Sequence, residues 1–422
     1  MMNLSAARFA AAALLVAACD SASVSSAETT STSAETASAE AASSNASSSA
    51  LVPVEMEIFV DDGTPIPRFM VDAAWPKLPA DQIIGQTSGL AVDGDDNVWI
   101  LQRPNSLGPT EAGAAMEPPI AVCCRPAPHV IQFSPEGDVV TAWGGPEHAP
   151  DIDGVNQWPV NVHGLFVDTE NTVWIGGNGD DDHVVLNFTA DGDFIRQFGQ
   201  RGVTRGNLDR ESLGNPSDIH YDAASGEVHV SDGYINKRVI GFDTSTDGFK
   251  RFWGANGVAP DAPTREGAFD VSQATSTSDG GADPEAAQFG DIVHCVNRTS
   301  DGYIYVCDRR NNRVQVFRAE GESVELVDNI VIAAETGGTR SASDVAFSPD
   351  ETYVYIADMM NGRVWILERA THRILAAFGR NGRYPGQFIW LHSVATDSEG
   401  NVFTSEVSTG RRVQRFVYMG AE

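Results

Sequence analysis

The stretch HGLFVDTENTVWIGGN, which runs from His163 to Asn178, decides the fold of this 422-residue chain. It contains two short apolar runs joined by a polar turn, the pattern typical of a β-hairpin. Five similar stretches are SGLAVDGDDNVWILQR, SDIHYDAASGEVHVSDGY, HCVNRTSDGYIYVCDRR, SDVAFSPDETYVYIADMM and HSVATDSEGNVFTSEV, which begin at Ser88, Ser217, His294, Ser343 and His392. Runs with a helical period are scarce, so the sequence predicts an all-β protein built from a repeat.

Each hairpin is followed by a third apolar run, such as HVVLNFTA or RVQVFRA, and most also by a fourth, such as FIRQFGQRG. Four short strands per unit are typical of a propeller blade, which buries its faces by stacking on its neighbours. Six units predict a six-bladed β-propeller over residues 51–422, whereas an open solenoid or two sandwiches fit the regular strand order less well. The last unit lacks a fourth run, and we expect residues 52–60 to supply it and close the ring.

The charge balance narrows the classes of partner. The chain has 28 Lys and Arg against 58 Asp and Glu, a formal charge of −30. Nucleic acid requires a basic face, so we expect no nucleic-acid partner. With 42% hydrophobic residues the chain can bury a sizeable core. We expect a monomer.

The first 50 residues predict export and anchoring. Residues 1–18 hold an apolar run too short to span a bilayer, as in a signal peptide. The run ends in small residues before Cys19, which resembles a bacterial lipobox, so we expect lipidation there; an ordinary signal peptide is the alternative. Residues 19–50, almost wholly Ser, Ala, Thr and Glu, read as a flexible tether. We therefore expect a lipid-anchored protein of the bacterial cell envelope, on its periplasmic or extracellular face, with no other membrane contact.

Two inserts, at 104–128 and 255–288, interrupt the repeat, and we expect them over one end of the ring as a lid, a rim or a disordered decoration. The first insert holds the adjacent pair Cys123 and Cys124, either a vicinal disulfide or two thiols. Cys295 and Cys307 flank one hairpin turn at equal distances, so they face each other across the strands. An oxidising compartment permits a disulfide between them.

The opening residues of the six hairpins alternate between serine and histidine, in the order Ser88, His163, Ser217, His294, Ser343 and His392. Alternate blades of a six-bladed ring are related by about 120°, and their innermost strands run beside the axis. The three imidazoles should therefore converge on one point. Three imidazoles with an open fourth position match a catalytic zinc site, although copper, nickel or iron also suits imidazole. Three ordinary core histidines are the alternative, which the shared register disfavours.

A second register follows the hairpins, where the channel opens. It consists of Arg103, Asn178, Tyr234, Arg309 and Met359. Two guanidinium groups and a phenol above a metal would bind a carboxylate and transfer a proton. For each arginine, a surface ion pair is the alternative, as with Asp308 beside Arg309.

With these residues in place, the chain resembles the NHL-repeat propellers and, more narrowly, the peptidyl-α-hydroxyglycine α-amidating lyases, over roughly residues 84–416. The segments that carry the resemblance are His163-Gly164-Leu165 with Asp168, the run SDGYINKR from Ser231, the set Asp308, Arg309, Asn311 and Arg313, and GQTSG from Gly85.

The resemblance implies a zinc-dependent lyase. By analogy, His163, His294 and His392 hold Zn²⁺, Tyr234 is the catalytic base, and Arg309 and Arg103 hold the substrate. The implied reaction cleaves the C–N bond of a carbinolamide, and it releases an amide and glyoxylate. The substrate would be a small molecule or a peptide with an α-hydroxyglycine-like end.

The resemblance also implies a structural Ca²⁺ on the backbone carbonyls of Leu90 and Leu165. The third ligand in the family is an Asp after the third histidine, and this chain has Ser393 there, so the calcium set is one ligand short. Two other functions stay open. One is a non-catalytic NHL propeller that binds a protein or another ligand on its rim. The other is a propeller lactonase, whose carboxylate-centred calcium the imidazole-rich axis disfavours.

Overall fold

A computed structural model describes residues 51–260, 282–336 and 340–422, and strands dominate its regular structure. The expected signal peptide, Cys19 and the tether lie outside the described residues. No helix in the described ranges is long and apolar enough to cross a membrane. The helices of these ranges are short 3-10 turns, namely η1 (Pro104–Ser106), η2 (Gly113–Ala115), η3 (Pro146–His148), η4 (Ala255–Gly257) and η5 (Arg309–Asn311).

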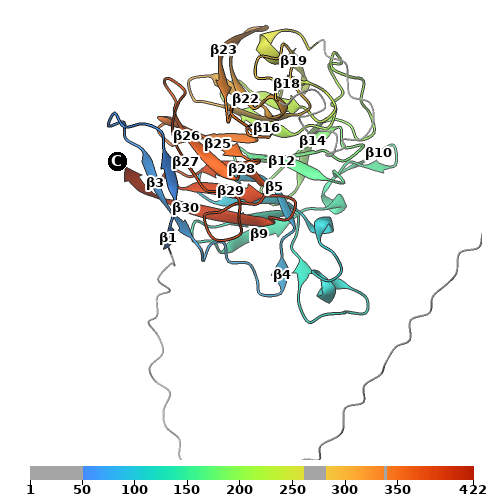
Figure 1. Ribbon diagram of the computed structural model, residues 1–422. Coiled ribbons are helices and arrows are strands. Elements are labelled where there is room, and N and C mark those ends of the chain that lie inside the picture. The colour runs from blue at the N-terminus through green and yellow to red at the C-terminus, as the bar shows by residue number, and fades with distance from the viewer. Residues whose placement is uncertain (1–50, 261–281, 337–339) are drawn as a thin grey trace, which may run out of the picture. The chain divides into compact units, whose positions relative to one another are not determined.

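Six antiparallel sheets form the blades, so the predicted six-bladed, all-β propeller is confirmed (Figure 1). From the innermost strand outward, the first three blades are β5 (Gln86–Val92), β6 (Val98–Arg103), β8 (Val130–Phe133), β9 (Val139–Trp143); β12 (Val162–Val167), β13 (Val173–Gly177), β14 (Val184–Phe188), β15 (Phe194–Gly199); and β16 (Asp218–Asp222), β17 (Glu227–Asp232), β18 (Arg238–Asp243), β19 (Gly248–Trp253). The last three are β20 (Val293–Arg298), β21 (Tyr303–Asp308), β22 (Arg313–Glu320), β23 (Ser323–Val331); β24 (Asp344–Phe347), β25 (Tyr353–Asp358), β26 (Arg363–Glu368), β27 (Arg373–Phe378); and β28 (Leu391–Thr396), β29 (Val402–Glu406), β30 (Arg412–Ala421), β3 (Pro67–Asp72).

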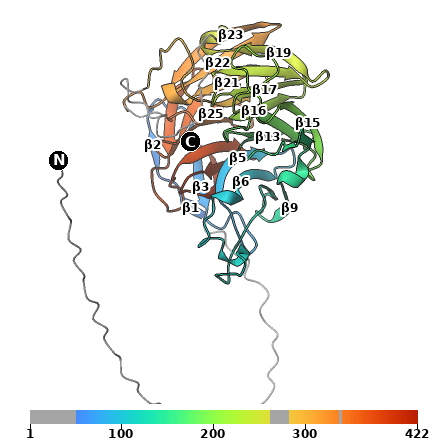
Figure 2. The ribbon, with the colours of Figure 1, turned by 90° about the vertical axis from the view of Figure 1, so that its right-hand side faces the viewer.

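The innermost strands form a closed circle. Each of them contacts the innermost strand of the next blade, and β28 of the sixth blade contacts β5 of the first. Figure 2 shows the sheets from a second direction. The first residues of the six innermost strands therefore face one shared tunnel. This arrangement allows the histidines of alternate blades to converge on one point.

The strand that completes the sixth blade differs from the expected one. It is β3 (Pro67–Asp72), which pairs with β30, and its side chains alternate so that Phe69 and Val71 are buried. Residues 52–60 were the wrong choice because they are mostly exposed. They form β1 (Leu51–Pro53), an outer strand on β3, and β2 (Met56–Ile58), which pairs with β27 of the fifth blade. The N-terminal segment thus joins the last two blades.

The core lies between neighbouring blades. Phe198 of β15 stacks on Phe242 of β18 with ring centroids 4.6 Å apart, and both are buried. Trp99 and Trp174 are buried in the same way in other blade contacts. Because each sheet buries its apolar side chains only against the next one, the ring holds the innermost strands at fixed positions.

The first insert lies between β6 and β8, and the second lies between β19 and β20 with residues 261–281 outside the described ranges. The first insert is anchored on the fold by a parallel pair of β4 (Gln82–Ile83) with β7 (Arg125–Pro126). Arg411, after the sixth blade's second strand, forms an ion pair with Glu111 and donates to the carbonyl of Ser106 at 2.9 Å. A small hairpin of β10 (Asp151–Ile152) and β11 (Val155–Asn156) precedes the second blade.

Candidate metal centre

The backbone of each histidine-bearing strand is irregular at the histidine itself. The ladder of β12 and β13 shifts register between Val162 and Leu165, that of β20 and β21 between Val293 and Val296, and that of β28 and β29 between Leu391 and Ser393. The first blade has the same shift between Thr87 and Gly89, around Ser88, whereas the first strands of the third and fifth blades pair without one. A bulge adds a residue and redirects the side chain there. These bulges therefore turn His163, His294 and His392 toward the axis.

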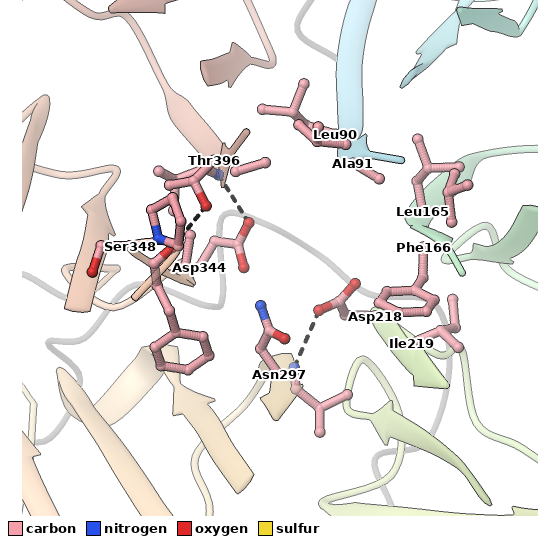
Figure 3. A pocket seen from close by; sticks show the side chains of 18 of the residues that line it. Leu90, Ala91, Leu165, Phe166, Asp218, Ile219, Asn297, Asp344, Ser348 and Thr396 are labelled. Carbon is pink, nitrogen blue, oxygen red and sulfur yellow. Dashed lines mark hydrogen bonds between the residues drawn. The ribbon is translucent and has the colours of Figure 1, made fainter. Parts of the chain in front are cut away.

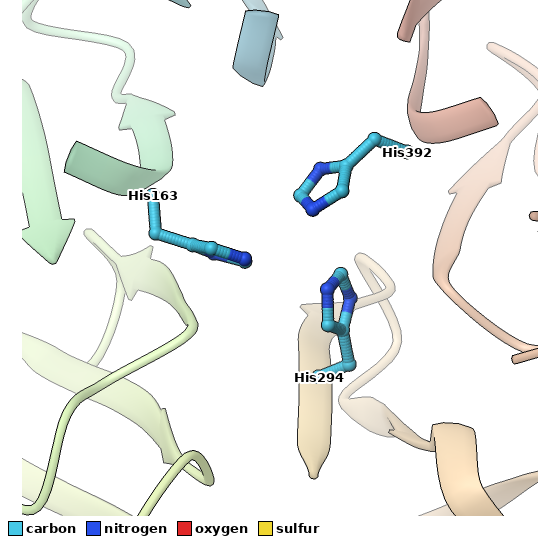
Figure 4. Close-up of side chains that lie close together, drawn as sticks. All are labelled: His163, His294 and His392. Carbon is cyan, nitrogen blue, oxygen red and sulfur yellow. The ribbon is translucent and has the colours of Figure 1, made fainter. Parts of the chain in front are cut away.

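The three imidazoles meet in the tunnel (Figure 4). Their ring centroids lie 4.8 to 5.1 Å apart, and one nitrogen of each ring falls within 4.8 Å of the other two. All three side chains are buried. Among the described residues this is the only group of three or more His, Cys, Asp or Glu side chains with ligand atoms this close.

Serine positions in the alternate blades orient the imidazoles. Nδ1 of His163 lies 2.6 Å from the carbonyl oxygen of Ser217, and Nδ1 of His294 lies 2.6 Å from that of Ser343. A carbonyl only accepts, so each Nδ1 carries the proton and each Nε2 keeps a lone pair. Nδ1 of His392 lies 3.2 Å from the hydroxyl of Ser393, which itself donates to the carbonyl of Ser88 at 3.4 Å.

The donor set fits a metal ion. Nε2 of His294 is buried and has no hydrogen-bond partner, although an unpaired buried nitrogen is costly. Burial, together with nearby guanidinium groups and, for His163 and His294, the neighbouring imidazoles, holds the pKa of all three histidines well below the ordinary value. They are therefore neutral at neutral pH, which is the form that binds a metal.

Tyr234 lies directly at this point. Its hydroxyl is 2.7 Å from Nε2 of His163, and because Nδ1 of that ring is the donor, the phenol donates to Nε2. Its ring lies 4.9 Å from that of His163 and 6.2 Å from that of His294. A phenol in this position can exchange a proton with a group held at the triad.

The loops that carry Tyr234 and Arg309 are built alike. Asp232 accepts from Asn236 at 2.7 Å and from Arg238 at 2.9 Å, while Asp308 accepts from Asn311 and Arg313, each at 2.8 Å. These buried carboxylates close the turn after the second strand of each blade. The sequence motifs around SDGYINKR and DRRNNR thus fix loops, and the residues just after the Asp face the tunnel.

A cavity of about 330 Å³ opens above the triad. Every residue of the predicted second register lines it, together with two histidines of the triad, His163 and His392. The full lining is Gln86, Arg103, Asn161, His163, Asn178, Tyr234, Arg309, Arg340, Met359, Trp390, His392, Val407 and Ser408. None of these is acidic, in a chain with a net charge of −30. The cavity therefore suits an anionic ligand.

Three buried guanidinium groups give the cavity its positive charge. Arg103 donates from Nε to the carbonyl of Val162 at 2.8 Å and from Nη1 to Gln86 at 3.0 Å, and burial lowers its pKa to about 10. Arg309 lies over the ring of Tyr234 at 5.9 Å. Burial also lowers the pKa of Arg309 and of Arg340.

Arg340, which lines the cavity beside Trp390, was not predicted from the sequence. The guanidinium of Arg340 lies 5.4 Å from the centroid of the Trp390 ring, and its backbone is in the left-handed region at φ 76°. Its amide donates to the carbonyl of Arg309 at 3.0 Å. Arg340 stands three residues before Ser343, outside the aligned register, so the repeat pattern gave no signal for it.

The expected calcium ligands lie below the triad. Leu90, Leu165 and Ser393 line a narrow cavity of about 20 Å³ with the three histidines. Ser393 offers a hydroxyl that is already hydrogen-bonded, where the family pattern has a carboxylate. The calcium set stays a prediction with one ligand missing.

The cysteines of the described chain lie as pairs. Cys295 and Cys307 face each other on β20 and β21 with an S–S distance of 2.02 Å. Cys123 and Cys124 form a vicinal disulfide in the first insert. The first pair ties the strand of His294 to its neighbour, one residue from the ligand.

Below the triad, Asp218 and Asp344 face a second cavity of about 320 Å³, which Glu351 also lines (Figure 3). Burial raises the pKa of Asp344 from 3.8 to about 7, and burial and the charge of Asp344 raise that of Asp218. From about pH 4 to pH 7, Asp344 therefore holds a proton in the folded chain that it releases in the unfolded chain. The stability that the protonated carboxyl group of Asp344 contributes is present at low pH and is lost as the pH rises through 7.

We expect Asp344→Asn to remove this dependence. The difference in melting temperature between variant and parent should grow in favour of the variant from pH 4 to pH 8, because the amide carries no charge. Thermal unfolding followed by circular dichroism at each pH measures it. A constant difference across that range would show that Asp344 does not titrate there.

The chain is similar to several known proteins. No protein-family model matches the sequence. NHL repeat-containing protein 3 of Mus musculus is 27% identical over 312 residues, which cover 71% of this chain and 70% of that protein. Peptidyl-glycine alpha-amidating monooxygenase B of Xenopus laevis is 24% identical over 362 residues, 79% of this chain but 34% of that protein, so the match spans about a third of its length. A solved streptogramin B lyase aligns at a TM-score of 0.47 and 11% identity over 83% of this chain and 98% of its own. The chain is a six-bladed propeller that resembles the NHL-repeat proteins and the lyase domain of the amidating enzyme.

Proposed function

We propose that this chain is a zinc-dependent lyase of the amidating type, which cleaves the C–N bond of a carbinolamide to give an amide and glyoxylate. The observation that carries the proposal is the tunnel triad of His163, His294 and His392 with the Tyr234 hydroxyl 2.7 Å from a ligand nitrogen. The resemblance to the amidating monooxygenase supports the reaction type. A propeller alone does not select a chemistry, so the site carries the argument.

Each part of the site has a role in this reaction. Zinc held by the three Nε2 atoms would lower the pKa of a hydroxyl brought to it. Arg103 and Arg309 bind the carboxylate of the substrate and direct its hydroxyl toward the triad. Tyr234 takes the hydroxyl proton while the C=O bond of glyoxylate forms and the C–N bond breaks. The electron pair of that bond stays on nitrogen, which receives the same proton back from Tyr234 and leaves as the amide.

The walls of the cavity would orient the ligand. Trp390, Met359 and Val407 are apolar, and Asn178 and Gln86 hold Arg103 through hydrogen bonds at 3.4 and 3.0 Å. Guanidinium groups held in this way lose little freedom when a carboxylate binds.

The direct test is glyoxylate release from α-hydroxyhippurate by the zinc-loaded protein. We expect turnover that a chelator stops and zinc restores. Metal binding without turnover would show that the site acts on another substrate, and a protein without bound metal would favour the ligand-binding propeller. We further propose that the protein works at the cell envelope, tethered by a lipid on Cys19.

Arg309→Met tests the anion-binding role. Methionine has a similar length and no charge, so we expect kcat/KM for α-hydroxyhippurate to fall by about 10²-fold, as when one preorganised donor is lost. Arg318→Met, an exposed arginine on the same blade, is the control and should have no effect. Equal rates for the Arg309→Met protein and the parent would remove Arg309 from the proposed mechanism.

A further inference from the structure

We propose that Asp218 and Asp344 are positioning residues that hold the backbone behind His294 and His392. Asp218 follows Ser217 in the third blade, and Asp344 follows Ser343 in the fifth. The carboxylate of each forms a hydrogen bond with the next blade. Asp218 Oδ2 accepts from the amide of Val296 at 3.1 Å, and Asp344 Oδ2 accepts from the amide of Val394 at 2.9 Å; both bonds are among the dashed lines in Figure 3. Both amides lie two residues after a histidine of the triad.

These amides belong to the strands that face the tunnel. An innermost strand pairs on one side only, so amides on its free side need another acceptor. The bulges at Val293 to Val296 and at Leu391 to Ser393 interrupt the regular ladder just there. A bulged strand bends readily, and a carboxylate fixed to the amide beyond the bulge holds that bend. The direction of each imidazole then depends on the Asp of the preceding blade.

The contact between the first and second blades, beside the third ligand His163, is built differently. Gly89 stands where an Asp would, and a Cβ there would lie 2.5 Å from Cβ and 3.1 Å from the amide nitrogen of Leu165. The two blades are too close for a carboxylate between them. His163 is held instead through the carbonyl of Val162, which accepts from Ser88 Oγ at 3.0 Å and from Arg103 Nε at 2.8 Å. The dependence on an aspartate is therefore specific to two of the three ligands.

This specificity allows a test in the metal-free protein, although the consequence for catalysis rests on the proposed function. The readout is the set of imidazole resonances of ¹⁵N-histidine-labelled protein. We expect Asp218→Ala to shift or broaden the resonances of His294 and to leave His163 unchanged. Asp344→Ala should act in the same way on His392. Asp218→Asn and Asp344→Asn keep an acceptor oxygen and should resemble the parent.

Asp397→Ala is the matched control. Asp397 is a buried carboxylate of the sixth blade that accepts from Asn401 within its own turn, so its loss should lower the melting temperature without moving the imidazoles. If Asp218→Ala does not fold, Asp218→Leu fills the same space without an acceptor. The inference is overturned if neither Asp variant moves its histidine, or if all three imidazoles move equally.

A Co²⁺ titration adds the metal. We expect the two alanine variants to bind Co²⁺ about 10- to 100-fold more weakly than the parent, the range typical of residues that orient a ligand. A parent protein that binds no Co²⁺ would contradict the proposed function, and the imidazole resonances would still decide the role of the aspartates. Unchanged Co²⁺ affinity in both alanine variants would contradict the positioning role.

Discussion

His294→Ala is expected to remove nearly all bound metal from the purified protein. The triad supplies three protein ligands, and two imidazoles cannot hold zinc with the affinity of three. The loss should exceed the roughly 10- to 100-fold that follows removal of a ligand's hydrogen-bond partner. Metal content per chain, measured after dialysis against a weak chelator, gives the result, and glyoxylate release should vanish with the metal.

The control for this variant is His183→Ala. His183 is also buried and lies in the second blade, but it is outside the triad, so one metal per chain should remain. Retention of a full equivalent of metal by the His294→Ala protein would show that the ion binds elsewhere.

Tyr234→Phe is expected to keep the metal and lose turnover. Phenylalanine preserves the ring beside His163 and removes only the hydroxyl, so the imidazoles still converge. Loss of a general base typically costs about 10²- to 10⁴-fold in rate. We expect kcat for α-hydroxyhippurate to fall by this factor while KM changes little, because the arginines that bind the carboxylate remain.

The chain offers a closely matched control. Tyr305 is also a buried phenol hydrogen-bonded to a histidine, with its hydroxyl 2.8 Å from Nε2 of His372, but it lies away from the cavity. Tyr305→Phe should therefore cost stability and leave turnover intact. Full activity in the Tyr234→Phe protein would make another group the base.

Much of this arrangement could be predicted from the sequence because the repeat carries geometric information. One aligned position per blade, alternating between serine and histidine, locates three side chains on an axis without any tertiary contact being known. The tunnel residues Tyr234 and Arg309 follow from the same alignment, since each stands just after the carboxylate that closes its loop.

Other features depend on contacts between blades, which a linear pattern does not contain. The closing strand was assigned to residues 52–60, yet β3 has the alternation of buried side chains that a blade needs. Backbone carbonyls orient two of the imidazoles, and a carbonyl leaves no mark in sequence. Arg340 enters the cavity from a connection between blades, outside every aligned position.

The most direct test of the account is anomalous diffraction at the zinc edge from crystals of protein purified without chelator. We expect one strong peak in the tunnel, about 2.0 to 2.1 Å from Nε2 of His163, His294 and His392. Crystals soaked in zinc that show no peak there, or imidazoles turned away from one another, would contradict it.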